Sequence, residues 1–397
     1  MKIVAVLENT ISAGGGFSQA LSAILQIKKI AEKNGYTLQV VTSEERNIAV
    51  LHSLAIDCTV YRMPSYTKFF QYLIESSFMV KKVLDFMYKR NWLYPIERIL
   101  TKQRPDILYF LQPSRIPKYL KNINFIYTLW DVGHRDFPEF PEVRREGVFL
   151  DRETAYKNIL PAAFLTITDS DTLSARLQYL YNLDRERLLA MPFNINPLLG
   201  QTSAEEVVEH QDVEGGFLFY PAQFWPHKNH IRILQAILGL REQGRSVKVV
   251  FVGGDKLNQG HVRNFIAMNK LESQVKILGF VEIEEIKRLY QSCIALIMPT
   301  YFGPTNIPPF EAWSYGKPVI YSDHLKAQVG DAAICVDPDS PQAIANAIID
   351  VFDQEKIAVL IEKGKERLAY YDDLRNVAEA DFLKHLIKFD QRSRNWG

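Results

Sequence analysis

A short run between two apolar segments combines residue types that suit anion binding. Residues 300–323 read TYFGPTNIPPFEAWSYGKPVIYSD. Asn306 is a candidate N-cap for a short helix that begins at Pro308, since proline is tolerated in the first helical turn. Backbone amides of residues 305–307 and the positive end of the helix dipole would then face the same point. The pattern predicts an anion site, with a diphosphate as its ligand.

Glu311 follows one turn into that helix, which Gly316 is predicted to end. A carboxylate at this depth can accept hydrogen bonds from a ribose diol, as the acidic residue of dinucleotide-binding folds does. The alternative is a capped helix in which Glu311 only complements the helix dipole.

A cation is predicted close to the same ligand. The segment YPAQFWPHKNH (220–230) follows an apolar strand, and Lys228 lies where the next helix should begin, with Asn229 beside it. A lysine at a helix start can hold a phosphate together with helix amides. The alternative is an exposed lysine in a loop.

A glycine-rich turn near the N-terminus is another candidate. In SAGGGFSQ (12–19), three consecutive glycines would let the backbone approach a ligand in front of a helix N-terminus. The G-x-G-x-x-G fingerprint is absent, so this is not a dinucleotide signature. A tight strand-to-helix turn explains it equally well.

The segment TLWDVGHRDFPEFPE (128–142) places Asp131 and His134 close enough to act on one hydroxyl, with Arg135 available for a charged group. An aspartate or histidine at a strand end can act as a general base or orient a substrate. Alternatively, Asp131 caps a turn and His134 is a hydrogen-bonded loop residue.

Residues 65–100 mix aromatic side chains with lysine and arginine. One interpretation is an interfacial helix that inserts apolar side chains into a bilayer while its cations meet anionic lipids. The other is a pair of core helices with extended lysines on their surface.

The elements that must position these residues follow an α/β rhythm. Apolar, β-branched runs alternate with stretches long enough for helices, such as the helix predicted over 17–34. This alternation predicts parallel sheets covered on both faces. The predicted strands are 3–8, 38–43, 58–63, 106–111, 125–130, 164–170, 216–222, 247–254, 275–281, 293–300, 318–323 and 333–338.

The rhythm is interrupted by a polar, acidic stretch that ends in Gly-Gly, which is typical of a linker. We therefore predict two doubly wound, Rossmann-like domains, 1–196 and 216–375, joined by a linker at 197–215. Ligands of such sheets bind beyond the carboxyl ends of the strands, so both domains are expected to face one cleft. The tail from about 340 is predicted helical, with a break at 370–374.

Composition narrows the class of protein. The chain has 397 residues, a net charge of +1 and 47% hydrophobic residues, which favours a folded two-domain protein and argues against a nucleic-acid binder. Its three cysteines lack metal-type spacing. No signal-peptide pattern and no run of 18 apolar residues is present, so a cytoplasmic location is expected.

Taken together, these residues resemble glycosyltransferase family 4, the retaining sugar-nucleotide transferases of the GT-B fold. The run LGFVEIEEIKRLYQSCIALIMPTYFGPTNIPPFEAWSYGKPVIYSD (278–323) is similar to the donor-site region of that family. PHKNH and VVFVGG fall where the family has its phosphate lysine and the next strand. WDVGHRDFPEF is similar to its acceptor-domain H-D-L-x-H…F-P-E-F stretch.

The resemblance implies roles for individual residues. Glu311 matches the glutamate that holds the ribose, Lys228 the lysine that binds the diphosphate, and Asp131 and His134 the residues near the acceptor and the reacting sugar. We take these four as the catalytic candidates. The implied donor-binding set is Gly14, Gly15, Gly16, Gln223, Asn229, Gly279, Phe280, Gly303, Thr305, Asn306, Ile307 and Glu311.

Three positions depart from the family pattern. Gly303 stands where the family has its first glutamate, Gln223 where it has an arginine, and Trp130 where it has the histidine of an H-D pair. Half of the cationic pair and the carboxylate that usually contacts the donor sugar are therefore missing, which puts the identity of the donor in question.

The resemblance implies a retaining, metal-independent hexosyltransferase without a cofactor, which moves a sugar from a UDP- or GDP-sugar to a saccharide or lipid-linked acceptor. Bacterial surface polysaccharide biosynthesis at the inner face of the membrane is the expected setting, with peripheral membrane contact through 65–100. It also implies that a final helix, about 376–397, crosses back onto the first domain. The alternatives are a non-catalytic nucleotide-sugar-binding protein and a sugar-nucleotide epimerase on the same fold.

Overall fold

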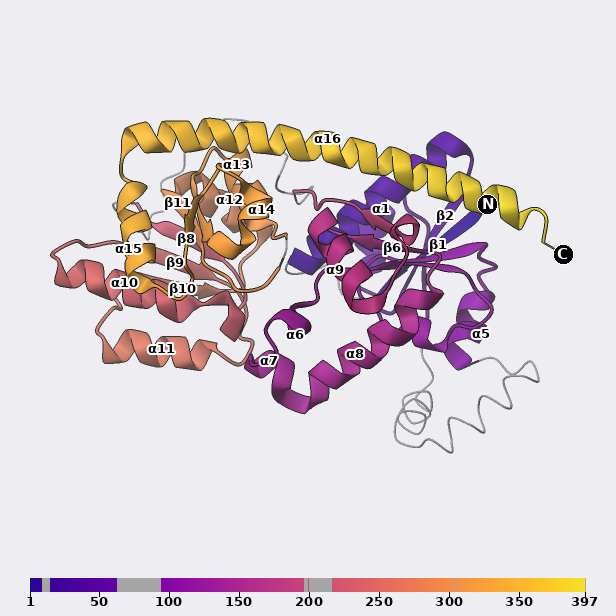
Figure 1. Cartoon of the computed structure of the whole chain (residues 1–397), viewed down its shortest axis with the longest axis horizontal. Coiled ribbons are helices and arrows are strands. Elements are labelled where there is room, and N and C mark those ends of the chain that lie inside the picture. The colour runs from indigo at the N-terminus through magenta and orange to yellow at the C-terminus, as the bar shows by residue number, and fades with distance from the viewer. Residues whose placement is uncertain (9–14, 63–93, 196–198, 200–215, 304, 397) are drawn as a thin grey trace.

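The computed structural model describes residues 1–8, 15–62, 94–195, 199, 216–303 and 305–396. It contains two sheets whose strands are all parallel (Figure 1). The first sheet has the order β3-β2-β1-β4-β5-β6-β7. Its strands are β1 (Lys2–Leu7), β2 (Thr37–Thr42), β3 (Cys58–Val60), β4 (Ile107–Phe110), β5 (Phe125–Thr128), β6 (Leu165–Thr168) and β7 (Leu188–Ala190).

The second sheet has the order β10-β9-β8-β11-β12-β13. Its strands are β8 (Leu218–Pro221), β9 (Val249–Val252), β10 (Val275–Gly279), β11 (Ala295–Met298), β12 (Val319–Ser322) and β13 (Ile334–Val336). In both sheets the strand order reverses beside the first strand, between β1 and β4 and between β8 and β11. Such switch points open crevices at the carboxyl ends of the strands.

All twelve predicted strands are present, and the doubly wound α/β class is confirmed. The sequence analysis missed β7, a three-residue edge strand too short to carry a periodic signal. Most of the predicted linker and residues 63–93 of the aromatic, basic segment lie outside the described residues. Domain boundaries at 196 and 216 therefore stay a prediction.

Helices cover both faces of each sheet, as continuous apolar strands require. The predicted helix at 17–34 is confirmed as α1, two residues longer at its start. The described helices are α1 (Gly15–Asn34), α2 (Asn47–Ser53), α5 (Pro95–Thr101), α6 (Gly133–Asp136), α7 (Pro141–Arg144), α8 (Val148–Ile159), α9 (Asp171–Tyr181), α10 (His230–Glu242), α11 (Gln259–Met268), α12 (Ile283–Ser292), α13 (Pro308–Ser314), α14 (Lys326–Val329), α15 (Pro341–Asp350) and α16 (Gln354–Ser393).

The C-terminal helix α16 runs across both halves of the molecule (Figure 1). The predicted break at 370–374 is wrong, because α16 is continuous over 40 residues. Tyr371 packs against Phe310 of the second domain with ring centroids 4.7 Å apart, and Phe382 packs against Tyr109 of the first sheet at 5.6 Å. Within the stretch predicted to be a break, Tyr371 is buried by its contact, whereas Tyr370, Asp372 and Asp373 are exposed. No helix in the described part of the chain is long and apolar enough to cross a membrane.

Candidate functional site

A cavity of about 470 Å³ lies between the two sheets, next to both switch points. The loops after β5, β8 and β11 contribute most of its wall. Its lining residues are Gln19, Trp130, Asp131, Glu142, Val143, Arg152, Phe193, Pro221, Ala222, Gln223, Trp225, His227, Lys228, Met298, Phe302, Gly303, Thr305, Asn306, Ile307 and Pro308. We call it the cleft cavity.

Lys228 lies in the wall of the cleft cavity, at the end of a short 3₁₀ turn after β8. Its Nζ donates a hydrogen bond of 3.3 Å to Oδ1 of Asn306. Burial lowers the pKa of Lys228 to about 8, and the charge of Asp131 acts in the opposite direction. Since Asp131 is itself paired with Arg152, Lys228 offers a cation to an anionic ligand.

The turn before α13 reaches the cleft cavity through Thr305, Asn306, Ile307 and Pro308. The predicted start of α13 at Pro308 is confirmed. However, Asn306 is not its N-cap: Ile307 holds that position, with no side-chain cap.

Asn306 instead stabilises the turn through hydrogen bonds. Its Nδ2 donates to the hydroxyl of Tyr321 at 2.7 Å, and its backbone N–H donates to Oε1 of Gln328 at 2.8 Å. The predicted set of three amides for a diphosphate is therefore reduced, because the Asn306 amide is occupied. Thr305 and Ile307 remain the candidates.

Glu311 lies behind the turn and does not line the cleft cavity. Its Oε2 accepts a hydrogen bond of 2.7 Å from the hydroxyl of Tyr290, a partner 21 residues away that local spacing does not reveal. Burial raises the pKa of Glu311 to about 7, although the Tyr290 bond acts to lower it. Glu311 as a whole residue is 8% exposed, so a ribose could reach its carboxyl group only after local movement.

The two departures in the donor region have direct structural consequences. Gly303 has φ +100°, and a Cβ added there would lie 2.9 Å from Nδ2 of Asn306. This backbone disfavours any side chain at 303, and Asn306 fills the adjacent space. Gln223 lines the cleft cavity and accepts a hydrogen bond of 3.2 Å from Nε1 of Trp225.

Asn229 was predicted to bind the donor, and the structure gives its side-chain amide two protein partners instead. It has φ +62° and forms the N-cap of α10. Its Nδ2 donates to the carbonyls of Pro299 at 2.9 Å and Pro338 at 2.8 Å, and the residue is 7% exposed. Both hydrogens of the amide are used to join two loops, so Asn229 holds the site together without facing a ligand.

On the first-domain side, Asp131 lines the cleft cavity as predicted, but it is not free. Its Oδ1 accepts hydrogen bonds from Arg152 at 2.7 Å and from the N–H of Gly133 at 2.8 Å. Burial acts to raise the pKa of Asp131, but the contacts with Arg152 outweigh it, so the pKa is lowered. Arg152 comes from α8, 21 residues away, and could not be identified from local spacing.

His134 was predicted to act on the same hydroxyl as Asp131, but the structure does not bring the two side chains together at the cleft cavity. The imidazole is fully buried, lies between Phe149 and Tyr156, and has its Nε2 3.4 Å from Oε2 of Glu153. It is not among the residues that line the cleft cavity. Burial lowers its pKa to about 4, so it is neutral.

Arg135 is not available for a ligand charge either. Its Nε donates to Oε2 of Glu153 at 2.7 Å, and its Nη2 contacts Oε1 of the same residue. The arginine that was expected to hold a charged group is thus paired with Glu153 inside the first domain.

Contacts across the cleft form a feature that sequence analysis missed. Oε1 of Glu142 in α7 accepts hydrogen bonds from His227 through its Nδ1 at 2.5 Å and its backbone N–H at 3.0 Å. Phe302 stacks on His227 with centroids 4.3 Å apart and lies 5.1 Å from Phe140. These residues join the two domains beside the cleft cavity.

The remaining predicted donor residues lie elsewhere or outside the described residues. Gly14 is not described, whereas Gly15 and Gly16 are the first residues of α1. One turn later, Gln19 lines the cleft cavity. Gly279 ends the edge strand β10 with φ +70°, and the side chain of Phe280 is 57% exposed; neither lines the cavity.

Two Rossmann-like sheets facing each other across a cleft define the GT-B architecture, and comparison with solved structures supports this class. The structure of Anabaena HepE in complex with UDP and glucose superposes with a TM-score of 0.69, covering 97% of this chain and 99% of that chain at 17% identity. At this identity the likeness establishes the fold.

Residues 203–367 match the sequence profile of the family described as glycosyl transferases group 1. The resemblance found in the sequence is confirmed at that level.

Two curated relatives are similar to this chain, each at 26% identity. The O-antigen chain mannosyltransferase RfbU of Salmonella typhimurium aligns over 208 residues, 52% of this chain and 55% of the relative. The O-antigen chain mannosyltransferase B of Escherichia coli aligns over 283 residues, 68% and 73%. The match thus spans about half the length of the first relative and nearly three quarters of the second.

Proposed function

We propose that the protein transfers a hexosyl group from a nucleoside diphosphate sugar to a saccharide or lipid-linked saccharide, as a member of glycosyltransferase family 4. The observation that carries this proposal is the position of Lys228. It is a cation held against Asn306 in the wall of a cleft cavity, at the switch point of a group 1 domain. Parallel sheets bind nucleotides at this position.

The proposed chemistry centres on the leaving group. As the bond between sugar and diphosphate breaks, negative charge develops on the phosphate oxygens. Lys228 and the amides of Thr305 and Ile307 would stabilise that charge, and interactions that strengthen as charge develops lower the barrier. We propose that these groups act without a metal ion and that the anomeric configuration is retained, as the resemblance to family 4 implies.

The roles of the other residues follow from their contacts. Asp131 is ionised and held by Arg152, so we propose that it orients a substrate hydroxyl by accepting its hydrogen bond. Glu311 is proposed to hold the ribose once the Tyr290 hydrogen bond yields. No role in the reaction is proposed for His134, Asn229 or Arg135.

Bacterial surface polysaccharide biosynthesis is the proposed setting, supported by the two O-antigen mannosyltransferases among the relatives. A mannosyl donor is therefore the first candidate to test. Peripheral membrane contact through 65–100 and a location at the inner face of the membrane also stay proposals.

The proposal is tested by incubating the purified protein with a panel of UDP- and GDP-sugars, including GDP-mannose, with and without candidate acceptors. We expect release of free nucleoside diphosphate from one donor, increased by the acceptor. A non-catalytic nucleotide-sugar-binding protein is the second candidate, favoured by Gly303 and Gln223. It would bind a donor in calorimetry without release, and that result would overturn the transferase proposal. Conversion of one sugar nucleotide to its epimer would indicate the epimerase alternative.

A further inference from the structure

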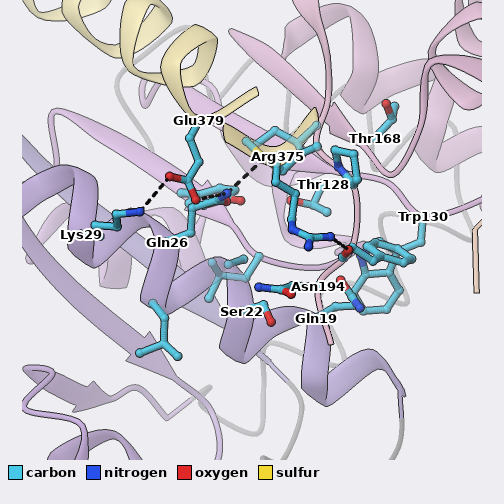
Figure 2. Close-up of a pocket in the computed structure, with 18 of the residues that line it drawn as sticks. Gln19, Ser22, Gln26, Lys29, Thr128, Trp130, Thr168, Asn194, Arg375 and Glu379 are labelled. Carbon is cyan, nitrogen blue, oxygen red and sulfur yellow. Dashed lines mark hydrogen bonds and ion pairs between the residues drawn. The ribbon is translucent and has the colours of Figure 1, made fainter. Parts of the chain in front are cut away.

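A second cavity, of about 380 Å³, lies in the first domain between α1 and α16 (Figure 2). It shares three lining residues with the cleft cavity: Gln19, Trp130 and Phe193. Its volume falls within the usual range of ligand pockets, and a single water molecule would fill only a small part of it. A ligand here would lie directly beside the cleft.

The wall of this cavity carries polar atoms without protein partners. In the described part of the chain, four residues of the wall have a side-chain atom that is buried and forms no hydrogen bond: Nε2 of Gln19, Oγ of Ser22, Oγ1 of Thr128 and Nε1 of Trp130. Buried polar atoms are nearly always hydrogen-bonded, and an unpaired one is costly. Four such atoms belong to residues of this wall, and a ligand with several hydroxyl groups could supply their missing partners when these side chains turn toward it.

Charged groups in the same wall neutralise one another. Nζ of Lys29 lies 3.3 Å from Oε2 of Glu379, and Arg375 pairs with Asp372. Arg375 also donates to the carbonyl of Phe193 at 2.8 Å. Figure 2 shows Arg375 reaching from α16 toward Trp130, while Gln19 and Ser22 lie on the α1 side. Because each cation already has a carboxylate partner, the wall suits an uncharged ligand better than a phosphate.

Aromatic side chains complete the wall. Tyr109, Trp130 and Phe193 all line the cavity. Aromatic rings next to a few placed polar groups can pack against the C–H face of a sugar ring while the polar groups bind its hydroxyls.

We propose that this cavity, the α1–α16 pocket, binds an uncharged pyranose unit of the acceptor saccharide. The inference rests on the proposed transferase function and deepens it. The pocket would read a sugar next to the reacting one, through Gln19, Ser22 and Trp130, while α16 closes it with Arg375. The C-terminal helix then contributes to acceptor recognition as well as joining the two domains.

The test uses the full chain without nucleotide and three neutral probes: methyl α-mannoside, methyl α-glucoside and methyl α-galactoside. Binding is followed by the ¹⁵N–¹H signal of the Trp130 indole, assigned with Trp130→Phe. We expect at least one probe to shift this signal saturably, and glucose 6-phosphate to bind more weakly than methyl α-glucoside. No saturable shift with any probe, or tighter binding of the phosphorylated sugar, would overturn the proposal.

Variants at Ser22 separate ligand binding from folding. Ser22→Ala removes an unpartnered hydroxyl, so its stability to urea should equal or exceed that of the wild type, whereas probe affinity should fall about three- to tenfold. Ser22→Leu should abolish binding by filling the pocket. Ser53→Ala, at an exposed hydroxyl of α2 bonded to the Val50 carbonyl, is the matched control. Unchanged affinity in both Ser22 variants would contradict the proposal.

Failure of this inference can be told apart from failure of the proposed function. Nucleoside diphosphate release is measured on the same preparation. Turnover without pyranoside binding rejects the pocket alone, whereas pyranoside binding that is lost in Ser22→Leu supports the pocket even if no donor is turned over.

Discussion

The two walls of the cleft differ in how their charges are arranged. On the first-domain wall, Asp131 is paired with Arg152, and Glu142 accepts hydrogen bonds from His227 of the opposite wall. On the second-domain wall, Lys228 contacts the neutral amide of Asn306 and the surrounding network is uncharged. The carboxylates of the first wall are held by hydrogen-bonding partners, and the second wall presents a cation.

This difference in charge means that the two walls favour different kinds of ligand. An uncompensated cation in a partly desolvated cavity attracts an anion more strongly than it would in water. A wall of paired charges and neutral hydrogen-bonding groups adds little net field, so it suits hydroxylated, uncharged groups. The comparison supports our proposal that the diphosphate binds against the second domain and the acceptor against the first.

Removing the free cation should have the largest effect. Lys228→Met keeps the length of the side chain but not its charge, so we expect turnover to fall about 100- to 1000-fold, as when one stabilising group is lost from a transition state. Nucleoside diphosphate release measures it. Lys326→Met, at an exposed lysine of the same domain, is the control. If Lys228→Met retains wild-type turnover, the comparison of the walls fails.

The same cation predicts a pH dependence. Because burial lowers the pKa of Lys228 to about 8, the free enzyme loses this charge as pH rises through 8. We expect kcat/KM to fall about tenfold per pH unit above that value. In Lys228→Arg, any remaining activity should lack this alkaline decline, since arginine stays charged. An identical decline in both proteins would assign it to another group.

Behind the second-domain wall lies a carboxyl group whose ionisation opposes folding. The pKa of Glu311 is raised from 4.5 to about 7, so its stabilising contribution is present below pH 4.5 and is lost as pH rises through 7. When the pH rises from 5 to 8, the unfolding free energy of the wild type should therefore fall more than that of Glu311→Gln. We expect the two decreases to differ by up to about 3 kcal/mol.

Urea titrations at both pH values measure this difference, with the exposed Glu272→Gln as the control. Equal pH dependence in wild type and Glu311→Gln would show that the Glu311 carboxyl is solvated in solution.

Breaking the compensation on the first-domain wall should act mainly on stability. Arg152→Met leaves Asp131 without its ion pair, and we expect a loss of about 2 kcal/mol of unfolding free energy. This loss is smaller than for a fully buried ion pair because both side chains are partly exposed. A double-mutant cycle with Asp131→Asn should show coupling of the pair. Additive effects would mean that the two charges do not interact.

The contact between the walls should have the smallest effect. Glu142→Ala removes the acceptor of two His227 hydrogen bonds. We expect a loss of about 1 kcal/mol in a cycle with His227→Ala, and a modest rise in KM for the donor. His227→Ala alone should resemble the double variant. Independent effects would show that the interdomain contact is open in solution.

Sequence reasoning predicted the local features well. β-branched, apolar runs located twelve strands, and proline and glycine correctly marked both ends of α13. It also placed Lys228, Thr305, Asn306 and Ile307 at one cavity, since parallel strands bring their carboxyl ends to the same edge.

Features that depend on distant partners were not predictable. Asn229 looked like a ligand residue, yet its amide binds two carbonyls 70 and 109 residues away. Asp131 owes its low pKa to Arg152, and His227 meets Glu142 from the other domain. The Tyr-Tyr-Asp-Asp stretch of α16 was predicted to break the helix. In the structure it is helical, and its Tyr371 packs against Phe310 of a distant segment, which local sequence does not reveal.

A crystal structure with a bound UDP- or GDP-sugar tests the central claim most directly. We predict that Nζ of Lys228 leaves Asn306 for a diphosphate oxygen at hydrogen-bonding distance, with the N–H groups of Thr305 and Ile307 facing the same phosphates. A nucleotide bound away from this turn, with Lys228 still on Asn306, would contradict the account.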